Sequence, residues 1–168
     1  GEDPGPTLVS MATRLQQAGC AAIAMPCNTA HHFAPAIKQA VKIPLLDMIE
    51  LAADYAVEAI GKGGCVGMLG SPAARRIGLF DNALGARGLT VIWPDHDDAL
   101  LAAIKIIKSH GPSTTARETL LAASVLLGKQ GADLQFIACS EFSLIADSVA
   151  PCVVAVDTLD LLTREIVS

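Results

Sequence analysis

The sequence predicts an α/β protein of two pseudo-symmetric halves, each built on a parallel sheet, with a cleft between them. Short apolar runs alternate with segments of helical spacing along the whole chain, a pattern typical of parallel sheets. Apolar residues make up 52% of the chain and aromatic residues only 4%, so Ala, Leu, Ile and Val must fill the interior. Such a composition suits strands that helices cover on both faces. An internal repeat, described below, indicates the two halves.

A turn-rich lead, residues 1–6, precedes the first elements. Glycines and prolines mark the ends of the segments that follow, because these residues interrupt regular backbone. The first part is expected to contain a helix over Thr7–Ala18, a strand over Cys20–Met25, a helix from about Thr29 to Val41 with a break at Pro35, a strand over Ile43–Met48 and a helix over Glu50–Ile60.

The remaining chain continues the alternation. Expected strands are Cys65–Leu69, Leu89–Trp93, Leu134–Ala138 and Cys152–Val156. Expected helices are Ala73–Ala86, Asp97–Lys108, Thr114–Lys129, a short one that opens at Cys139 and a last one over Thr158–Val167.

One unit occurs twice in the sequence. A helix ends at Gly19 or Gly131, a cysteine follows eight positions later at Cys27 or Cys139, and a helix, a strand and a helix come next. The first copy lacks the preceding strand–helix–strand–helix lead of about 45 residues that the second copy has. We therefore expect an N-terminally incomplete first half, residues 1–47 plus 152–168, and a second half, residues 48–151. The chain would cross near Pro44 and return near Pro151.

Composition excludes several classes of function. A net charge of -5 without a cluster of Lys or Arg argues against a nucleic-acid surface. The longest stretch without charge, Leu15–Ile37, contains Gln, Pro, Asn and His and makes a poor membrane span. Five cysteines, an odd number, fit reduced thiols in a cytoplasmic protein better than a disulfide framework. Cys20, Cys65 and Cys152 are expected to be small core residues.

Cys27 and Cys139 each lie where a strand ends and a helix begins, which is where parallel α/β folds place their chemistry. The N–H groups and dipole of the helix favour the thiolate there. Two such thiols, one in each half, could act on opposite faces of one carbon, with one removing a proton and the other delivering one. That chemistry is racemisation or epimerisation without a cofactor.

The carbanion formed in such a reaction needs donors that hold the substrate carboxylate. The residues that follow the strand ends supply them: Asn28, Thr29, Ala30, Ser71 and Ser140. The side chains of Asn28, Thr29, Ser71 and Ser140 could equally be ordinary helix N-caps.

His31 lies four residues after Cys27, a spacing that two metal ligands on one helix would have. No third or fourth ligand is evident, so we expect no metal. We expect His31 instead to pack or to hydrogen-bond behind the cysteine, where it tunes the thiolate. Glu141, at a helix start, is either an orienting residue for Cys139 or a cap that the helix dipole favours.

The motifs Pro26-Cys27-Asn28-Thr29-Ala30-His31 and Ala138-Cys139-Ser140-Glu141, with Val66–Ser71 in support, resemble the aspartate/glutamate racemase superfamily over the whole chain. Glu141, where glutamate racemases usually have His, resembles the aspartate racemase branch. Arylmalonate decarboxylases usually keep only the second cysteine, so Cys27 argues against that reaction. Ser140 replaces the family's usual Thr and keeps the hydroxyl, whereas Ala74 loses one.

The resemblance implies an enzyme that racemises an acidic amino acid, aspartate above all, without pyridoxal phosphate. Cys27 and Cys139 would be the acid/base pair, residues 28–30 the carboxylate-binding turn, and Lys108 a contact to the second carboxylate of the substrate. The only partner expected besides this small molecule is a second copy of the chain, in a homodimer.

Two other classes stay open. A hydantoin racemase or maleate isomerase would keep the cysteines but take another substrate or use one thiol as a nucleophile. Family members usually begin with a strand and a Gly-rich turn, about 50 to 60 residues, that this sequence lacks. An inactive fragment or a ligand-binding relic is therefore the non-enzymatic alternative.

Overall fold

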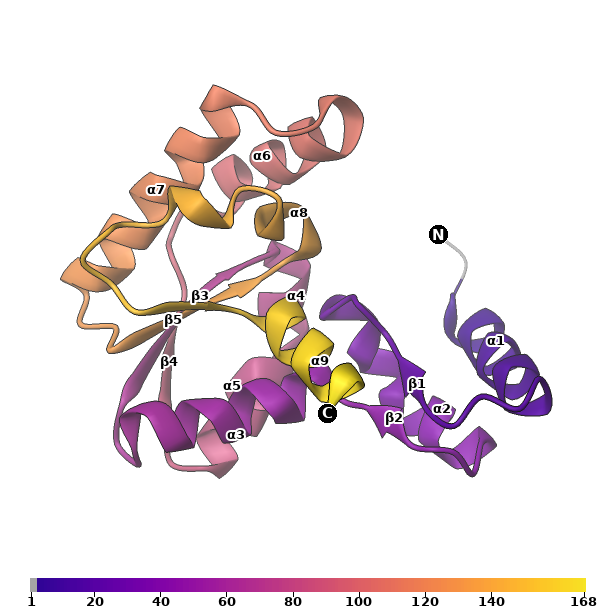
Figure 1. The fold of residues 1–168 in the computed structure, drawn as a ribbon. Coiled ribbons are helices and arrows are strands. Elements are labelled where there is room, and N and C mark those ends of the chain that lie inside the picture. Colours follow the sequence, from indigo (N-terminus) through magenta and orange to yellow (C-terminus); the bar gives the residue numbers. More distant parts are fainter. Residues whose placement is uncertain (1–2) are drawn as a thin grey trace.

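The computed structural model describes residues 3–168, in two bodies of unequal size (Figure 1). The first two residues of the expected turn-rich lead lie outside the described residues. The larger body contains a four-stranded sheet of order β4-β3-β5-β6, and the smaller body contains a two-stranded sheet, β1-β2. Every pair of neighbouring strands is parallel, which confirms the predicted α/β fold. The strands are β1 (Ile23–Ala24), β2 (Leu45–Leu46), β3 (Cys65–Gly70), β4 (Thr90–Ile92), β5 (Leu134–Ala138) and β6 (Ala155–Asp157).

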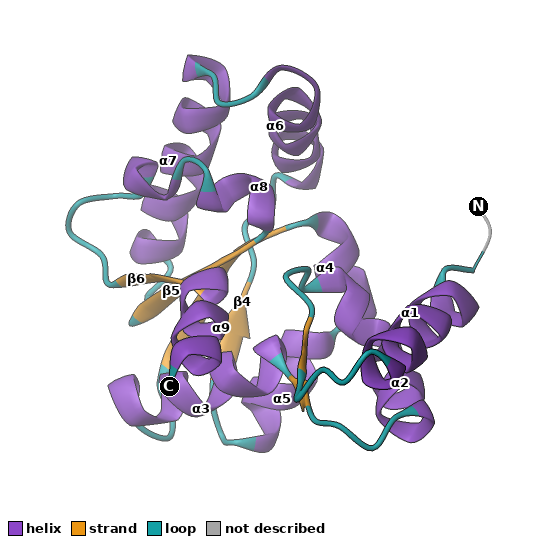
Figure 2. Cartoon of the chain, turned by 45° about the vertical axis from the view of Figure 1, so that its right-hand side comes forward, coloured by secondary structure: helices purple, strands orange, loops and turns teal. Residues whose placement is uncertain are grey.

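Helices cover both faces of the larger sheet (Figures 1 and 2). One layer packs α3 (Met48–Ile60), α5 (Leu79–Ala86) and α9 (Thr158–Val167) around the buried rings of Phe80 and Phe136. The other packs α6 (Asp97–His110), α7 (Thr114–Lys129) and the short α8 (Ser140–Ser143) around Leu120 and Phe142. The central strand β5 is buried along its whole length, as strands between two helix layers must be.

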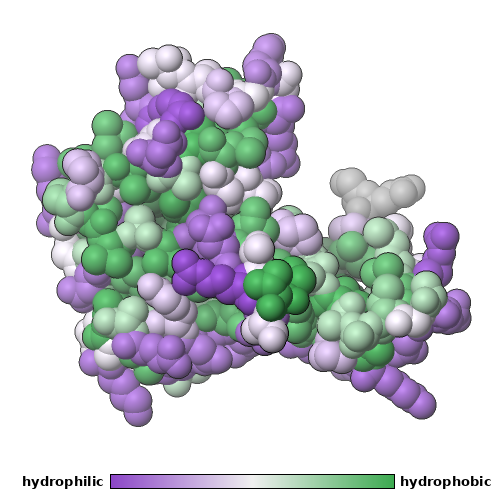
Figure 3. All heavy atoms as spheres, in the orientation of Figure 1, coloured by the Kyte–Doolittle hydropathy of each residue, from purple (hydrophilic) through white to green (hydrophobic). Residues whose placement is uncertain are grey.

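The smaller body consists of α1 (Gly5–Gln17), the 3₁₀ helix η1 (Thr29–Phe33), α2 (Ala34–Ala40) and the two short strands. Its core is a separate cluster that includes Ile23 and Ile37. In the space-filling view a narrow waist joins this body to the larger one, and a hollow opens between them (Figure 3). Strands β1 and β2 pair only with each other, and the hydrogen-bonded pairing extends over two residues of each strand. The six-residue strands predicted here are therefore wrong in length.

Two predicted helices are interrupted. Residues 29–40 start as η1 and continue as α2 with Pro35 in its first turn, which is where a proline fits. Residues 72–86 form α4 (Pro72–Ile77) and α5, divided at Gly78, whose φ of 74° ends α4 in the left-handed region. The predicted core location of Cys152 is also wrong, because the residue is exposed in the turn before β6.

The expected division of the chain placed residues 152–168 with the first half. Strand β6 instead pairs with β5 and so extends the larger sheet. Helix α9 packs mainly on α3 but also contacts β2 of the smaller body. The C-terminal segment thus lies at the junction of the two bodies (Figure 1). Within residues 3–168, no helix combines the length and the apolar content that crossing a membrane requires.

A buried polar cluster joins α7, β5 and the loop before β6. The Ser124 hydroxyl donates to Oε1 of Gln135 at 2.7 Å and accepts from the Ala150 N–H at 3.0 Å. Ser124→Ala would leave both groups buried without a partner. We expect the free energy of unfolding, measured with urea, to fall by about 1–3 kcal/mol.

The matched control is Ser109→Ala on α6, whose hydroxyl is exposed and bonds its own helix. This change should stay within about 0.5 kcal/mol. Equal effects of the two substitutions would contradict a structural role for the buried cluster.

Candidate active site

A pocket of about 320 Å³ lies where the two bodies meet. Eight of the ten site residues predicted from sequence line it. Ala30 does not line it, and the buried His31 lies behind it. The eight are Cys27, Asn28, Thr29, Ser71, Lys108, Cys139, Ser140 and Glu141.

The sheet topology explains why these residues meet. Strands β3 and β5 are neighbours in register, with Gly70 paired to Ala138, so Ser71 and Cys139 follow adjacent strand ends. Cys27 comes three residues after β1 of the smaller body. Carboxyl ends of parallel strands from both bodies therefore supply the cysteines of one pocket.

Cys139 keeps its proton. The side chain is only 8% exposed, and its Sγ donates a hydrogen bond to Oε2 of Glu141 at 3.0 Å. Burial, the hydrogen bond to Glu141 and the negative charge of Glu141 raise the pKa of Cys139 to about 12. The sequence-based expectation of a thiolate favoured by the helix start is therefore wrong for Cys139, because burial and the carboxylate outweigh the helix N–H groups.

Glu141 lies between the thiol and a cation. Lys108, which is 64% exposed, places its Nζ 3.3 Å from Oε1 of Glu141. Burial alone would raise the pKa of Glu141, but the hydrogen bond from Cys139 and the charge of Lys108 hold it below its ordinary value. Of the two sequence-based alternatives for Glu141, these contacts match an orienting residue for Cys139.

Cys27 differs from Cys139 in its surroundings, since its side chain is exposed to solvent. The loop that carries it is fixed to the larger body by the next two residues. Asn28 Nδ2 donates to Thr158 Oγ1 at 3.1 Å, and Thr29 Oγ1 lies 3.3 Å from Ser71 Oγ. The exposed cysteine thus sits on a loop with two attachments to the opposite body.

His31 supports the same loop from behind. Its Nε2 accepts the Met48 N–H at 3.1 Å, so the ring proton is on Nδ1, which donates to the Cys27 carbonyl at 2.9 Å. The expected hydrogen bond behind the cysteine is present, and it reaches the backbone of Cys27. Ser143, four residues after Cys139, makes the corresponding contact to the Cys139 carbonyl at 3.4 Å.

Sequence reasoning missed Arg76, on α4, which also lines the pocket. The neighbouring Arg75 pairs with Asp97, whereas Arg76 has no ion-pair partner among residues 3–168. The signal available was a basic residue one helical turn beyond Ser71-Pro72.

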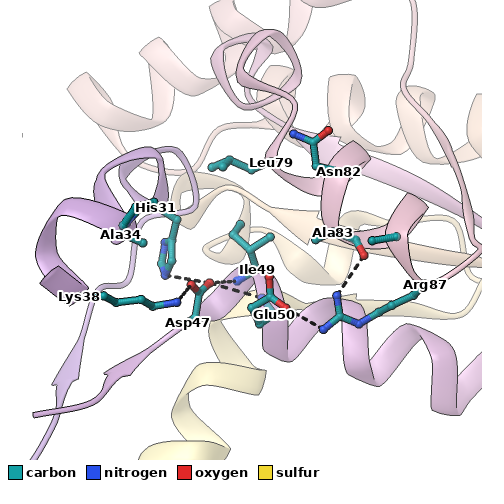
Figure 4. A pocket seen from close by; sticks show the side chains of 12 residues that line it. His31, Ala34, Lys38, Asp47, Ile49, Glu50, Leu79, Asn82, Ala83 and Arg87 are labelled. Atoms are coloured by element: carbon teal, nitrogen blue, oxygen red, sulfur yellow. Dashed lines mark hydrogen bonds and ion pairs between the residues drawn. The ribbon is translucent and has the colours of Figure 1, made fainter.

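A second pocket, of about 440 Å³, lies behind His31 between α2, α3 and α5 (Figure 4). Its charged side chains pair with one another, Lys38 with Asp47 at 2.6 Å and Arg87 with Glu50 at 2.7 Å. It contains no cysteine. The smaller pocket is therefore the candidate active site.

Comparison with known proteins identifies the family. The model of the Asp/Glu/Hydantoin racemase family matches residues 1–166, so the chain belongs to that family. A relative is the broad specificity amino-acid racemase RacX of Bacillus subtilis (strain 168), 27% identical over 165 residues, which are 96% of this chain and 70% of the relative. The chain is accordingly an amino-acid racemase, a class of isomerase.

Solved structures show the same fold. An aspartate racemase from Picrophilus torridus is 24% identical with a TM-score of 0.81, and the match covers 99% of this chain and 69% of that one. A glutamate racemase from Francisella tularensis subsp. tularensis SCHU S4, in complex with D-glutamate, is 14% identical with a TM-score of 0.76, covering 97% and 61%. The resemblance read from the two cysteine motifs is confirmed at the level of the family.

Glu141→Gln tests the cause of the raised pKa of Cys139. Removing the negative charge should lower that pKa, and the thiolate absorbance in the ultraviolet should appear at lower pH than in the wild type. The signal of Cys139 is obtained as the difference from Cys139→Ser in the same background. An unchanged titration would show that burial alone determines the shift.

Proposed function

We propose that the chain racemises an acidic amino acid, with aspartate the first candidate, by a two-base mechanism in which Cys27 and Cys139 exchange protons with opposite faces of the α-carbon. The observation that carries the proposal is the meeting of both cysteines, one from each body, in one pocket. Each comes from the carboxyl side of a parallel strand.

The protonation state of Cys139 supports different roles for the two cysteines, with one removing the α-proton and the other delivering a proton. A two-base racemase needs one thiolate and one thiol at the start of each turnover. Cys139, buried and hydrogen-bonded to Glu141, is the thiol in the ligand-free site, so we assign it the delivery of the proton and assign the removal of the α-proton to Cys27.

The reaction then balances without a cofactor. The Cys27 thiolate takes the α-proton, and the electron pair of the broken C–H bond passes into a carbanion conjugated with the carboxylate. Cys139 delivers its Sγ proton to the opposite face, which leaves Cys139 as thiolate and Cys27 as thiol. Glu141 and Lys108 lie beside the sulfur that becomes charged, and the Lys108 ammonium offsets the repulsion between thiolate and carboxylate.

Cations and hydroxyls of the pocket match a dicarboxylate substrate. Arg76 and Lys108 contribute positive charge, and Thr29, Ser71 and Ser140 contribute hydroxyls. The Asn28 Oδ1, buried and without a hydrogen-bond partner among residues 3–168, is an acceptor that suits the substrate ammonium. A site with two cations and a single carboxylate favours an acidic substrate over a neutral one.

The test is NMR of L- and D-aspartate with the protein in deuterated water. We expect the α-proton to exchange and both enantiomers to appear, and we expect Cys27→Ser and Cys139→Ser each to lower racemisation by at least about a hundredfold, the order that a positioned acid or base contributes. Cys152→Ser, at an exposed cysteine outside the pocket, is the matched control and should keep full activity.

Undiminished racemisation in either active-site variant would contradict the two-base assignment. A covalent adduct on a single cysteine would instead indicate a nucleophilic reaction of the maleate isomerase type. Exchange of the proton of a hydantoin, without exchange in any amino acid, would indicate a hydantoin racemase of the same family.

A further inference from the structure

Thr158, the first residue of α9, joins the two cysteine-bearing segments through one side chain. Its hydroxyl accepts from Asn28 Nδ2 at 3.1 Å and donates to the carbonyl of Ile137 at 3.1 Å. Asn28 directly follows Cys27, and Ile137 lies on β5 two residues before Cys139. A single buried hydroxyl thus connects the backbone beside one cysteine with the side chain beside the other.

The direction of these bonds is fixed by their chemistry. A carbonyl only accepts, so the one hydroxyl proton of Thr158 goes to Ile137. The lone pairs of the hydroxyl are then left for a donor, and Asn28 must present its NH₂ group. Its Oδ1 consequently points away from Thr158, which is the orientation in which it has no partner among residues 3–168.

The bridge has no counterpart in the other copy of the repeat. Asp157 caps α9 as Asp47 caps α3, so Thr158 corresponds to Met48. Met48 has no side-chain hydroxyl and contributes only its backbone N–H, to His31. A polar side chain with 0% exposure is costly unless its bonds are made, and here the repeat shows that an apolar residue fits the equivalent place. The hydroxyl therefore serves something beyond filling the core.

The geometry points to Thr158 as a positioning residue that sets the placement of Cys27 relative to Cys139, an inference that rests on the proposed two-cysteine reaction. Thr158 does not line the pocket, so it would act without contact to a substrate bound there. It acts through the Asn28 side chain and the end of β5. Two side-chain bonds, described above, join the Cys27 loop to the larger body. Without the Thr158 hydroxyl, only the one between Thr29 and Ser71 remains.

The experiment compares Thr158→Val, which keeps the shape and removes the hydroxyl, with Thr158→Ser, which keeps the hydroxyl. Thr158→Val should lower kcat by on the order of tenfold to a hundredfold, the cost of misplacing a reacting group by about 1 Å, with a smaller change in KM. Thr158→Ser should restore kcat. Thr163→Val is the matched control, because the Thr163 hydroxyl is exposed on the same helix and bonds only Leu159.

A second readout does not need activity. A short probe that alkylates the exposed Cys27 and carries a photoactivatable group should, on illumination, link to the segment around Cys139 in the wild type, in Thr158→Ser and in Thr163→Val, and peptide mass spectrometry identifies the linked peptides. The yield of this link should fall in Thr158→Val. If Thr158→Val does not fold, Thr158→Ala replaces it, because alanine also lacks the hydroxyl and is smaller than threonine.

Wild-type kcat and wild-type linking in the folded variant without the hydroxyl would overturn the role of Thr158 and leave the proposed function intact. If the protein racemises no amino acid, the proposed function fails, and the linking yield still decides whether Thr158 sets the position of Cys27 relative to the segment around Cys139.

Discussion

Two side-chain hydrogen bonds, from Asn28 to Thr158 and between Thr29 and Ser71, hold the Cys27 loop against the larger body. Everything the pocket can do depends on this contact, because the two sheets are separate and no strand of one pairs with a strand of the other. Each sheet positions its own cysteine at the carboxyl side of a strand. The loop contact, together with the packing of η1 on α4 and of α9 on β2, converts two strand ends into one site.

The two cysteines of the pocket lie in different electrostatic surroundings. Cys139 is enclosed by the larger body and donates a hydrogen bond to Glu141, whereas Cys27 is open to solvent. Helix starts usually favour thiolates, but α8 has only four residues, and burial together with a neighbouring carboxylate exceeds its effect. The raised pKa of Cys139 also ties stability to pH. This contribution is full below the ordinary pKa of a cysteine and is lost as the pH rises toward about 12.

Much of the fold could be predicted from sequence where the signal was local and strong. The long helix Thr114–Lys129, the buried strand Leu134–Ala138 and the last helix, Thr158–Val167, have the predicted bounds. The predictions were wrong where the length of a strand, or the sheet that it joins, depends on the strand with which it pairs. The first strand is two residues long because its ladder is that short, and β6 joins the larger sheet because β5 offers it an edge.

The candidate site could be predicted well because its residues follow strand ends, which a sequence marks clearly. What a sequence does not carry is distance between separate segments. The pairing of Glu141 with both Cys139 and Lys108, and the position of Arg76 in the pocket wall, depend on how helices α4, α6 and α8 pack. Thr158 belongs to this class as well, since 130 residues separate it from Asn28.

The central claim is that the proton removed from the α-carbon and the proton returned to it belong to different sulfur atoms. It is tested most directly by following the circular dichroism of L-aspartate with the intact protein in deuterated water. A two-base site replaces the α-proton with deuterium on the opposite face, and removal of that deuterium is slower. The signal should therefore cross zero before it returns to the racemic value. A monotonic approach to zero, with D-aspartate that retains its original proton, would contradict the account.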